Sequence, residues 1–155
     1  ATAAAGVTTV GLATTYTGFL LTNPIASTVN LAVNKCTFMQ SVIQATTLSG
    51  VGLGVGYLST ANHTNVTTGS TPKSCFLGGK TPQGITYTVA TLSATPTYYC
   101  FLANSQTAIL NNNPVMIDLE GGLILPPGGF VMFTTAAVSP AASVWFAFEW
   151  EDTPV

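Results

Sequence analysis

The sequence has 155 residues, of which 47% are hydrophobic and only 5% are charged, and its formal net charge is −2. This length suits a single domain, but globular proteins usually carry roughly 25% charged residues. The chain has three lysines and no arginine. We therefore expect neither nucleic-acid binding, which needs several cations at phosphates, nor an enzyme of phosphorylated substrates. No apolar run approaches the roughly 18 residues of a membrane span.

The chain begins with small residues and many threonines. We expect residues 1–17 to form an extended arm and residues 18–155 to form the domain. The start lacks the basic segment of a signal peptide, which predicts synthesis in the cytoplasm. Gly18–Pro24 reads as an apolar strand that ends at an Asn-Pro turn signal. Ser27–Met39 alternates apolar and polar residues, which is typical of a half-buried strand.

The middle of the chain contains a strand pattern and then its most polar stretch. Glycines recur at every second position from Gly50 to Gly56, which predicts a surface approached closely by another backbone or a large aromatic ring. Ala61–Cys75 reads as a long loop. His63 in this loop is the only histidine, and we expect it to be solvated because no acid lies near it in the sequence.

The second half reads as strands separated by turns. Gln83–Leu102 gives two strands broken at Pro96. Val115–Leu125 gives a strand interrupted by a break at Gly121 and Gly122, and Pro126–Gly129 predicts a tight turn. Ser143–Val155 alternates, with Phe146 and Phe148 on one face and Trp145 and Glu149 on the other.

No window has a helical period of apolar residues. About eight short strands at near-regular spacing predict an all-β fold, namely a single-domain antiparallel β-sandwich that is jelly-roll-like and has an extended N-terminal arm.

The five acids all lie in the last 38 residues. Asp118 and Glu120 are two apart and would share a face of a strand, so a glycosidase carboxylate pair and a calcium site are alternatives. Edge-strand charges that discourage mispairing are the favoured interpretation. No phosphate loop or nucleophile elbow is present, and we expect no catalytic residue, metal or cofactor.

The three cysteines are Cys36, Cys75 and Cys100. Their wide spacing is not a metal signature. We favour buried thiols that act as small hydrophobes, with one disulfide as an alternative and a metal or nucleophilic role as the remaining one.

Two C-terminal segments carry a family resemblance. They are IDLEGGLILPPGGFVMF at Ile117–Phe133 and WFAFEWEDTPV at Trp145–Val155. Nearer the start, Leu20 and Leu21 precede Asn23-Pro24. With these features the chain resembles small virion proteins of tailed phages, mainly over its last forty residues. The resemblance implies a capsid decoration (cement) protein or a related head or fibre component, commonly a β-sandwich and often trimeric.

The resemblance and the composition predict a binding protein and not an enzyme. The expected location is the capsid surface of a bacteriophage virion, after synthesis in the host cytoplasm. The expected partners are the major capsid protein and copies of the chain itself, as a homotrimer, with no nucleic acid or membrane. Aromatic residues fill subunit interfaces well, so we expect Phe130, Trp145 and Trp150 there.

Two alternatives remain open at this point. One is a head fibre or receptor-binding module in which Asn62, His63 and Asn65, with nearby tyrosines, contact a glycan; the candidate tyrosines are Tyr87, Tyr98 and Tyr99. The other is a self-assembling fibre subunit, to which an N-terminal arm could add a strand.

Overall fold

The computed structural model describes residues 15–40, 49–58, 64–68, 72–75, 78–91, 96–105, 114–135 and 144–155. Within these ranges no helix is long and apolar enough to cross a membrane. The strands are β1 (Thr15–Thr22), β2 (Val29–Gln40), β3 (Ser49–Tyr57), β4 (Thr64–Thr68), β5 (Ile85–Thr91), β6 (Thr97–Ser105), β7 (Val115–Leu125), β8 (Gly129–Thr135) and β9 (Val144–Pro154).

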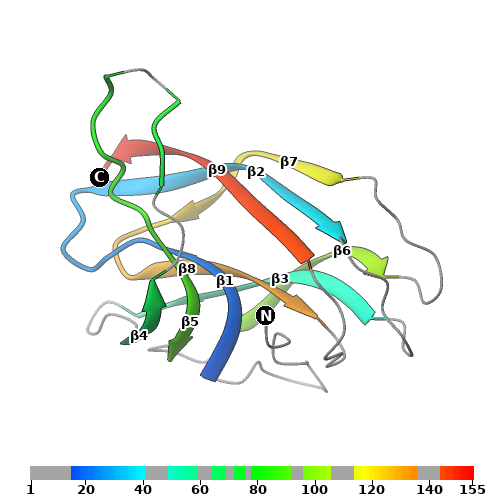
Figure 1. Ribbon diagram of the computed structural model, residues 1–155. Coiled ribbons are helices and arrows are strands. Elements are labelled where there is room, and N and C mark those ends of the chain that lie inside the picture. The colour runs from blue at the N-terminus through cyan, green and yellow to red at the C-terminus, as the bar shows by residue number, and fades with distance from the viewer. Residues whose placement is uncertain are drawn as a thin grey trace.

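The strands form two antiparallel sheets that pack face to face, which confirms the predicted β-sandwich (Figure 1). The larger sheet has the order β4-β5-β1-β8-β3-β6, and the smaller sheet has the order β7-β2-β9. None of the six strands of the larger sheet contains a charged residue.

The pairing of the first eight strands follows a jelly-roll pattern. β1 pairs with β8, β2 with β7, β3 with β6 and β4 with β5, as in a long hairpin folded over on itself. Two features differ from a symmetric jelly roll. The β4–β5 hairpin extends the larger sheet, where β5 pairs with β1, and β9 is an added strand beside β2.

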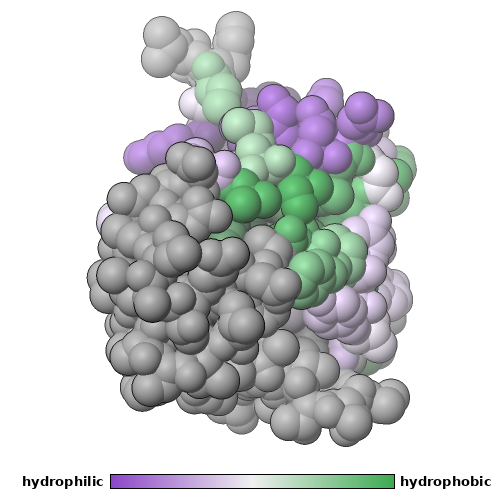
Figure 2. Space-filling view, turned by 90° about the vertical axis from the view of Figure 1, so that its right-hand side faces the viewer, coloured by the Kyte–Doolittle hydropathy of each residue, from purple (hydrophilic) through white to green (hydrophobic). Residues whose placement is uncertain are grey.

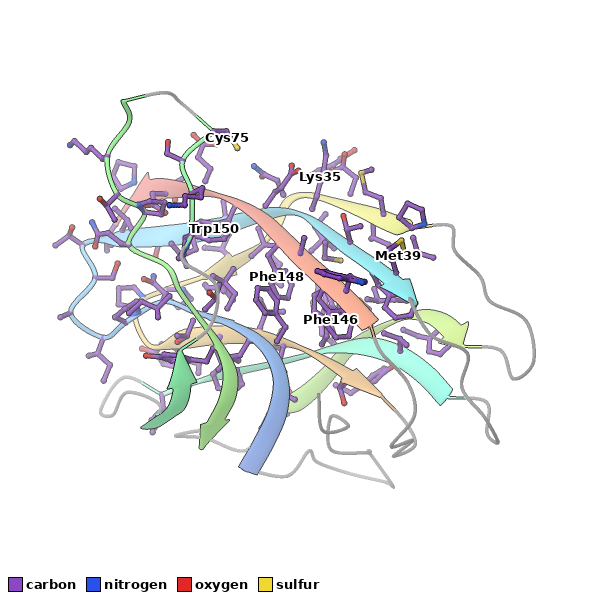
Figure 3. The ribbon with its side chains drawn as sticks, in the orientation of Figure 1. Lys35, Met39, Cys75, Phe146, Phe148 and Trp150 are labelled. Carbon is purple, nitrogen blue, oxygen red and sulfur yellow. The ribbon has the colours of Figure 1, made fainter. Side chains whose placement is uncertain are left out.

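The core between the sheets is built from the alternating strands that the sequence predicts. Leu31 and Val33 on β2 are fully buried, as are Leu53 on β3 and Phe133 on β8. Phenylalanine rings stack through the centre. Phe133 lies 4.3 Å from Phe146 and 4.6 Å from Phe148 between ring centroids, and both partner rings point from β9 toward the larger sheet (Figure 3).

The larger sheet also buries side chains on the face turned away from the smaller sheet. Leu20 on β1 pairs with Met132 on β8 on that face, and both are fully buried, as is Phe130. The expectation that Phe130 lies at a subunit interface is therefore wrong. Its side chain has no exposed area within the single chain, so it has nothing to offer a neighbour.

The glycine stripe of β3 lies on this same face. A Cβ atom on Gly56 would come within 2.3 Å of the ring of Phe130, and one on Gly52 within 2.5 Å of the hydroxyl of Tyr98. The predicted close approach of an aromatic ring is thus confirmed, and the rings come from neighbouring strands of the same sheet.

The turn at Pro126–Gly129 is confirmed, and it joins the two sheets. The Gly129 N–H donates to the Pro126 carbonyl at 2.7 Å, and the chain passes from β7 in the smaller sheet to β8 in the larger one. The segment that follows β1 crosses between the sheets beside it. There the Asn23 and Gly128 backbones are bonded, with Gly128 N donating to Asn23 O at 2.8 Å.

Three local expectations change. The Ala61–Cys75 stretch is not one long loop, because Thr64–Thr68 forms β4 and pairs with β5. The arm predicted over residues 1–17 is too long, because β1 begins at Thr15, and residues 1–14 lie outside the described part.

The break at Gly121 and Gly122 is a bulge within β7 and not a turn. Val33 pairs with Leu123 and Lys35 with Asp118, so four residues of β7 lie opposite one of β2.

Candidate interaction surface

All five acidic residues lie on β7 and β9, the two edge strands of the smaller sheet. Lys35 lies on the central strand β2, and its partners in register are Asp118 on one side and Glu149 on the other. Its ammonium nitrogen is 4.0 Å from the Glu149 carboxylate, and both side chains are partly exposed, so this pair adds little to stability. The edge-strand interpretation of the acids agrees with this placement.

Apolar side chains lie beside these charges on the same solvent-facing side. Trp145 is 67% exposed and Met116 is 62% exposed. Trp145 pairs with Met39 across β9 and β2, and Thr37 pairs with both Met116 and Ala147. Viewed from the end where β2 stops and β7 starts, hydrophilic residues cover the top of the molecule and a hydrophobic band lies below them (Figure 2). We call the side of the smaller sheet that is turned away from the larger sheet the outer face. Its residues are Lys35, Thr37, Met39, Met116, Asp118, Trp145, Ala147, Glu149 and Glu151.

Asp118 and Glu120 form a solvated bulge. Both side chains are exposed, and an Asp118 carboxylate oxygen accepts the Glu120 N–H at 3.0 Å. Glu120 has a φ of 51° and Gly121 one of 72°. A glycosidase acid needs a desolvated carboxyl group, and this arrangement does not provide one. Among the described residues no three His, Cys, Asp or Glu side chains cluster in a way that could hold a metal ion.

Trp150 lies on the inner side of β9, apart from Trp145. Its indole N–H donates to one oxygen of Asp152 at 3.0 Å, while the other oxygen accepts the Gln83 N–H, also at 3.0 Å. A Cβ on Gly84 would lie 3.0 Å from the Trp150 ring. Trp150 therefore contacts residues of its own chain, and it anchors the end of the β4–β5 connection on β9.

The connection between β4 and β5 projects beyond the smaller sheet. We call residues 72–75 and 78–84 the projecting loop; it rises past the end of β9 and stands above the rest of the molecule (Figures 1 and 2). Lys73, Cys75 and Lys80 are exposed on it, and Cys75 is seen near its top (Figure 3). At its base the Gln83 amide oxygen accepts the Thr28 N–H, and the Gln83 amide nitrogen donates to the Thr28 hydroxyl, each at 3.0 Å.

A second exposed apolar surface lies on β6, an edge strand of the larger sheet. Tyr98, Tyr99 and Phe101 are between 44% and 55% exposed. Two bulges in the pairing of β6 with β3 bring the adjacent Tyr98 and Tyr99 to the surface together. The strand has no charged residue, so these bulges are its visible protection against pairing with another strand.

Only part of the loop that is predicted to contact a glycan lies within the described residues. Asn62 and His63 lie outside the described residues. Asn65 lies on β4, at the opposite edge of the larger sheet from β6. With neighbouring strands about 4.8 Å apart, β4 and β6 are more than about 20 Å apart. Tyr98 and Tyr99 therefore lie far from the Asn65 region, whereas Tyr87 on β5 lies beside β4, where it pairs with Thr68.

The cysteines are all free. Cys36 is buried in the core, and burial, with a smaller contribution from the thiol of Cys100, raises its pKa from 9.0 to about 11. The pKa of Cys100 is also raised by burial. Cys75 is exposed. The interpretation as buried hydrophobes holds for Cys36, and the disulfide alternative is wrong for all three.

The sequence expectations missed the outer face and the projecting loop as surfaces. The alternation that places Trp145 and Glu149 on one side of β9 was visible, but strand order was needed to bring Met39 and Met116 beside them. Comparisons of this chain with models of protein families, with curated proteins and with solved structures gave no significant match.

Proposed function

We propose that this chain is a structural protein of a phage particle, a capsid decoration (cement) protein that binds the shell as an oligomer, with a homotrimer as the expected state. The proposal places it on the capsid surface, with the major capsid protein and copies of itself as partners. Its activity is binding, without turnover and without a cofactor.

The observation that carries the proposal is the outer face. Trp145 and Met116 are each more than 60% exposed and lie together with Met39. Covering the exposed part of one tryptophan removes on the order of 130 Å² from water, which is worth about 3 kcal/mol at about 25 cal/mol per Å². Large exposed aromatic side chains next to polar ones are typical of a surface that a protein partner covers.

Three further features support the same proposal. The strands of the larger sheet carry no charge, so copies repel each other little. The jelly-roll pairing is shared by many viral capsid proteins, although lectins use it too, so this likeness is an analogy of fold and not of function. The resemblance of the C-terminal segments to phage virion proteins points the same way.

The test is co-sedimentation of the purified protein with phage heads that lack their decoration layer. We expect the protein to bind the heads and to raise the temperature at which they open. Trp145→Ala combined with Met116→Ala should weaken binding at least tenfold, while Tyr57→Ala, an exposed aromatic residue at the end of β3, should have little effect. A stable monomer that binds no heads would contradict the proposal.

The second candidate is a glycan-binding module, and the β6 surface favours it. Tyr98, Tyr99 and Phe101 form an uncharged aromatic strip, and such rings suit the apolar faces of sugars. The expected result is binding to some members of a glycan array that Tyr99→Ala together with Phe101→Ala removes. The Tyr57→Ala protein serves as the matched control, and an array without hits would count against this candidate.

A further inference from the structure

Charges of opposite sign are segregated on this molecule. The acids lie on the two edge strands of the smaller sheet, and Lys35 is the one base among them. The other two lysines, Lys73 and Lys80, are exposed on the projecting loop. Among the described residues the only ion pair within 4.0 Å joins Lys35 and Glu149. The loop thus carries two cations that no described acid neutralises.

The outer face carries an excess of negative charge, which complements the two lysines of the loop. Asp118, Glu149 and Glu151 are exposed on it against the single Lys35. Two copies of this face would repel each other, because each is acidic. A partner that presents cations fits it, and the projecting loop of another copy is such a partner.

We propose that the projecting loop of one copy docks, through Lys73 and Lys80, on the outer face of a second copy, beside Glu149 and Glu151. The contact is heterologous, since loop meets sheet, and a contact of this kind closes into a ring when its rotation closes. It concerns copies of this chain in solution and does not depend on a capsid. It uses the end of the outer face that carries Glu149 and Glu151, whereas Trp145 and Met116 lie toward the other end of the face.

The structure holds the loop ready for such a contact. Hydrogen bonds of Gln83 with Asp152 and Thr28 fix the base of the loop. They hold the direction in which the loop projects. The outer face measures on the order of 500 Å², from three strands about 4.8 Å apart and about 11 residues long. One contact of a loop with this face is therefore smaller than the roughly 800 Å² per partner of a standard stable interface. In a closed ring each copy makes two such contacts, one through its loop and one through its face, so the ring holds each copy more firmly than a single contact would.

The first test exchanges the charges and measures association by sedimentation velocity. Lys73→Glu with Lys80→Glu should weaken self-association at least about tenfold, as should Glu149→Lys with Glu151→Lys. An equimolar mixture of the two variants should associate more strongly than either variant alone, because the acidic loop of one variant then meets the basic face of the other, and the basic loop meets the acidic face. A mixture that associates no more strongly than the separate variants, or unchanged association of either variant alone, would overturn the proposal.

A matched control separates the local contact from net charge. Lys73→Gln with Lys80→Gln lowers the net charge by two, and so does Tyr57→Glu with Tyr99→Glu on the larger sheet. We expect the first pair to weaken association and the second to leave it unchanged. Equal weakening by both would overturn the proposal. An unmodified protein that stays monomeric at all concentrations would do the same, whatever it does with phage heads.

The native thiol on the loop provides an independent measurement. In Ala147→Cys, mild oxidation should join Cys75 of one copy to the new thiol on the outer face of another. Mixing 15N-labelled and unlabelled protein before oxidation identifies the link by mass spectrometry, because a bond between copies yields peptide pairs of mixed isotope. Ala147→Cys with Cys75→Ser should lose this product. Links found only within one chain, or none, would contradict the docking.

Discussion

Cys36 shows how burial decides the chemistry of a single residue. It is 1% exposed in the core between the sheets, and this environment disfavours the thiolate, so its pKa rises to about 11. The thiol form is a poor nucleophile and a poor metal ligand. At this position the apolar character of cysteine is what the fold uses.

The raised pKa of Cys36 predicts how stability depends on pH. Well below pH 9 the thiol is protonated in both the folded and unfolded chains, and its contribution to stability is constant. Between about pH 9 and 11 the unfolded chain loses the proton while the folded chain keeps it, so the free energy of unfolding falls as pH rises. We expect urea unfolding at several pH values to show a negative slope in this window, to which Cys36 contributes most and Cys100, whose pKa is also raised by burial, adds.

Two substitutions check the assignment of that slope to Cys36. Cys36→Ala should reduce the slope, whereas Val33→Ala, which removes buried apolar atoms but no titrating group, should lower stability without changing the slope. A slope of the same size in the Cys36→Ala protein would show that another group is responsible.

At the scale of the elements, β3 and β8 fit together through glycine. Gly56 lies opposite Phe130 in the register, and the fully buried ring of Phe130 occupies the space where a Cβ on Gly56 would stand. A closely packed interior has little room to move such a ring. The glycines of β3 are therefore required for packing on the face of the larger sheet that is turned away from the smaller sheet.

This fit predicts a specific pairwise coupling. Gly56→Ala should lower the free energy of unfolding by about 1–3 kcal/mol through overpacking. Phe130→Leu alone should also destabilise the protein, but the double variant should lose less than the sum of the two single losses, because the smaller side chain frees space for the new methyl group. A double-mutant cycle from urea unfolding measures this, and simple additivity would refute the steric account.

The larger sheet and the smaller sheet are tied together at one end by Asn23. Its side-chain amide donates to the carbonyls of Val29 and Leu125, at 2.8 and 2.9 Å, where β2 begins and β7 ends. Its backbone bonds Gly128 and Gly129 beside the start of β8. One fully buried residue thus fixes two of the places where the chain crosses between the sheets, namely β1 to β2 and β7 to β8.

Asn23→Ala should therefore destabilise the whole molecule. It would leave two carbonyls of the crossovers without their donor, at an expected cost of about 3 kcal/mol. Asn23→Asp should be worse, because a buried carboxylate would face those carbonyl oxygens. Thermal unfolding provides the measurement, with Thr81→Ala, at an exposed position of the projecting loop, expected within about 0.5 kcal/mol of the unmodified protein. A loss in Asn23→Ala no larger than that of the control would contradict the role of the tie.

Much of the fold could be predicted because alternation reports directly on which side of a strand is buried. It assigned the faces of β2 and β9 correctly. The burial of Phe130 was also readable, since the unbroken apolar run FVMF is typical of a strand buried on both faces. Phe130 belongs to this run, so its position in a strand buried on both faces decides its place, and its aromatic ring does not.

The surfaces were harder to predict than the strands because they depend on strand order. Nothing local shows that β4 and β6 lie at opposite edges of the larger sheet, which separates Asn65 from Tyr98 and Tyr99. In β4 the many threonines suggested a polar loop, although their branched side chains also favour strands. Because Thr64–Thr68 pairs with β5, this segment forms a strand and not a loop.

The separation of charge described for the two sheets also gives the molecule an electric dipole. Its acids are gathered on the smaller sheet, while the strands of the larger sheet carry no charge at all. A molecule of this kind turns in the field of a charged surface before it touches it, over distances of about 10 Å at moderate salt. Its orientation on arrival would then be selected during the encounter, and adding salt would slow productive association more than it would speed dissociation.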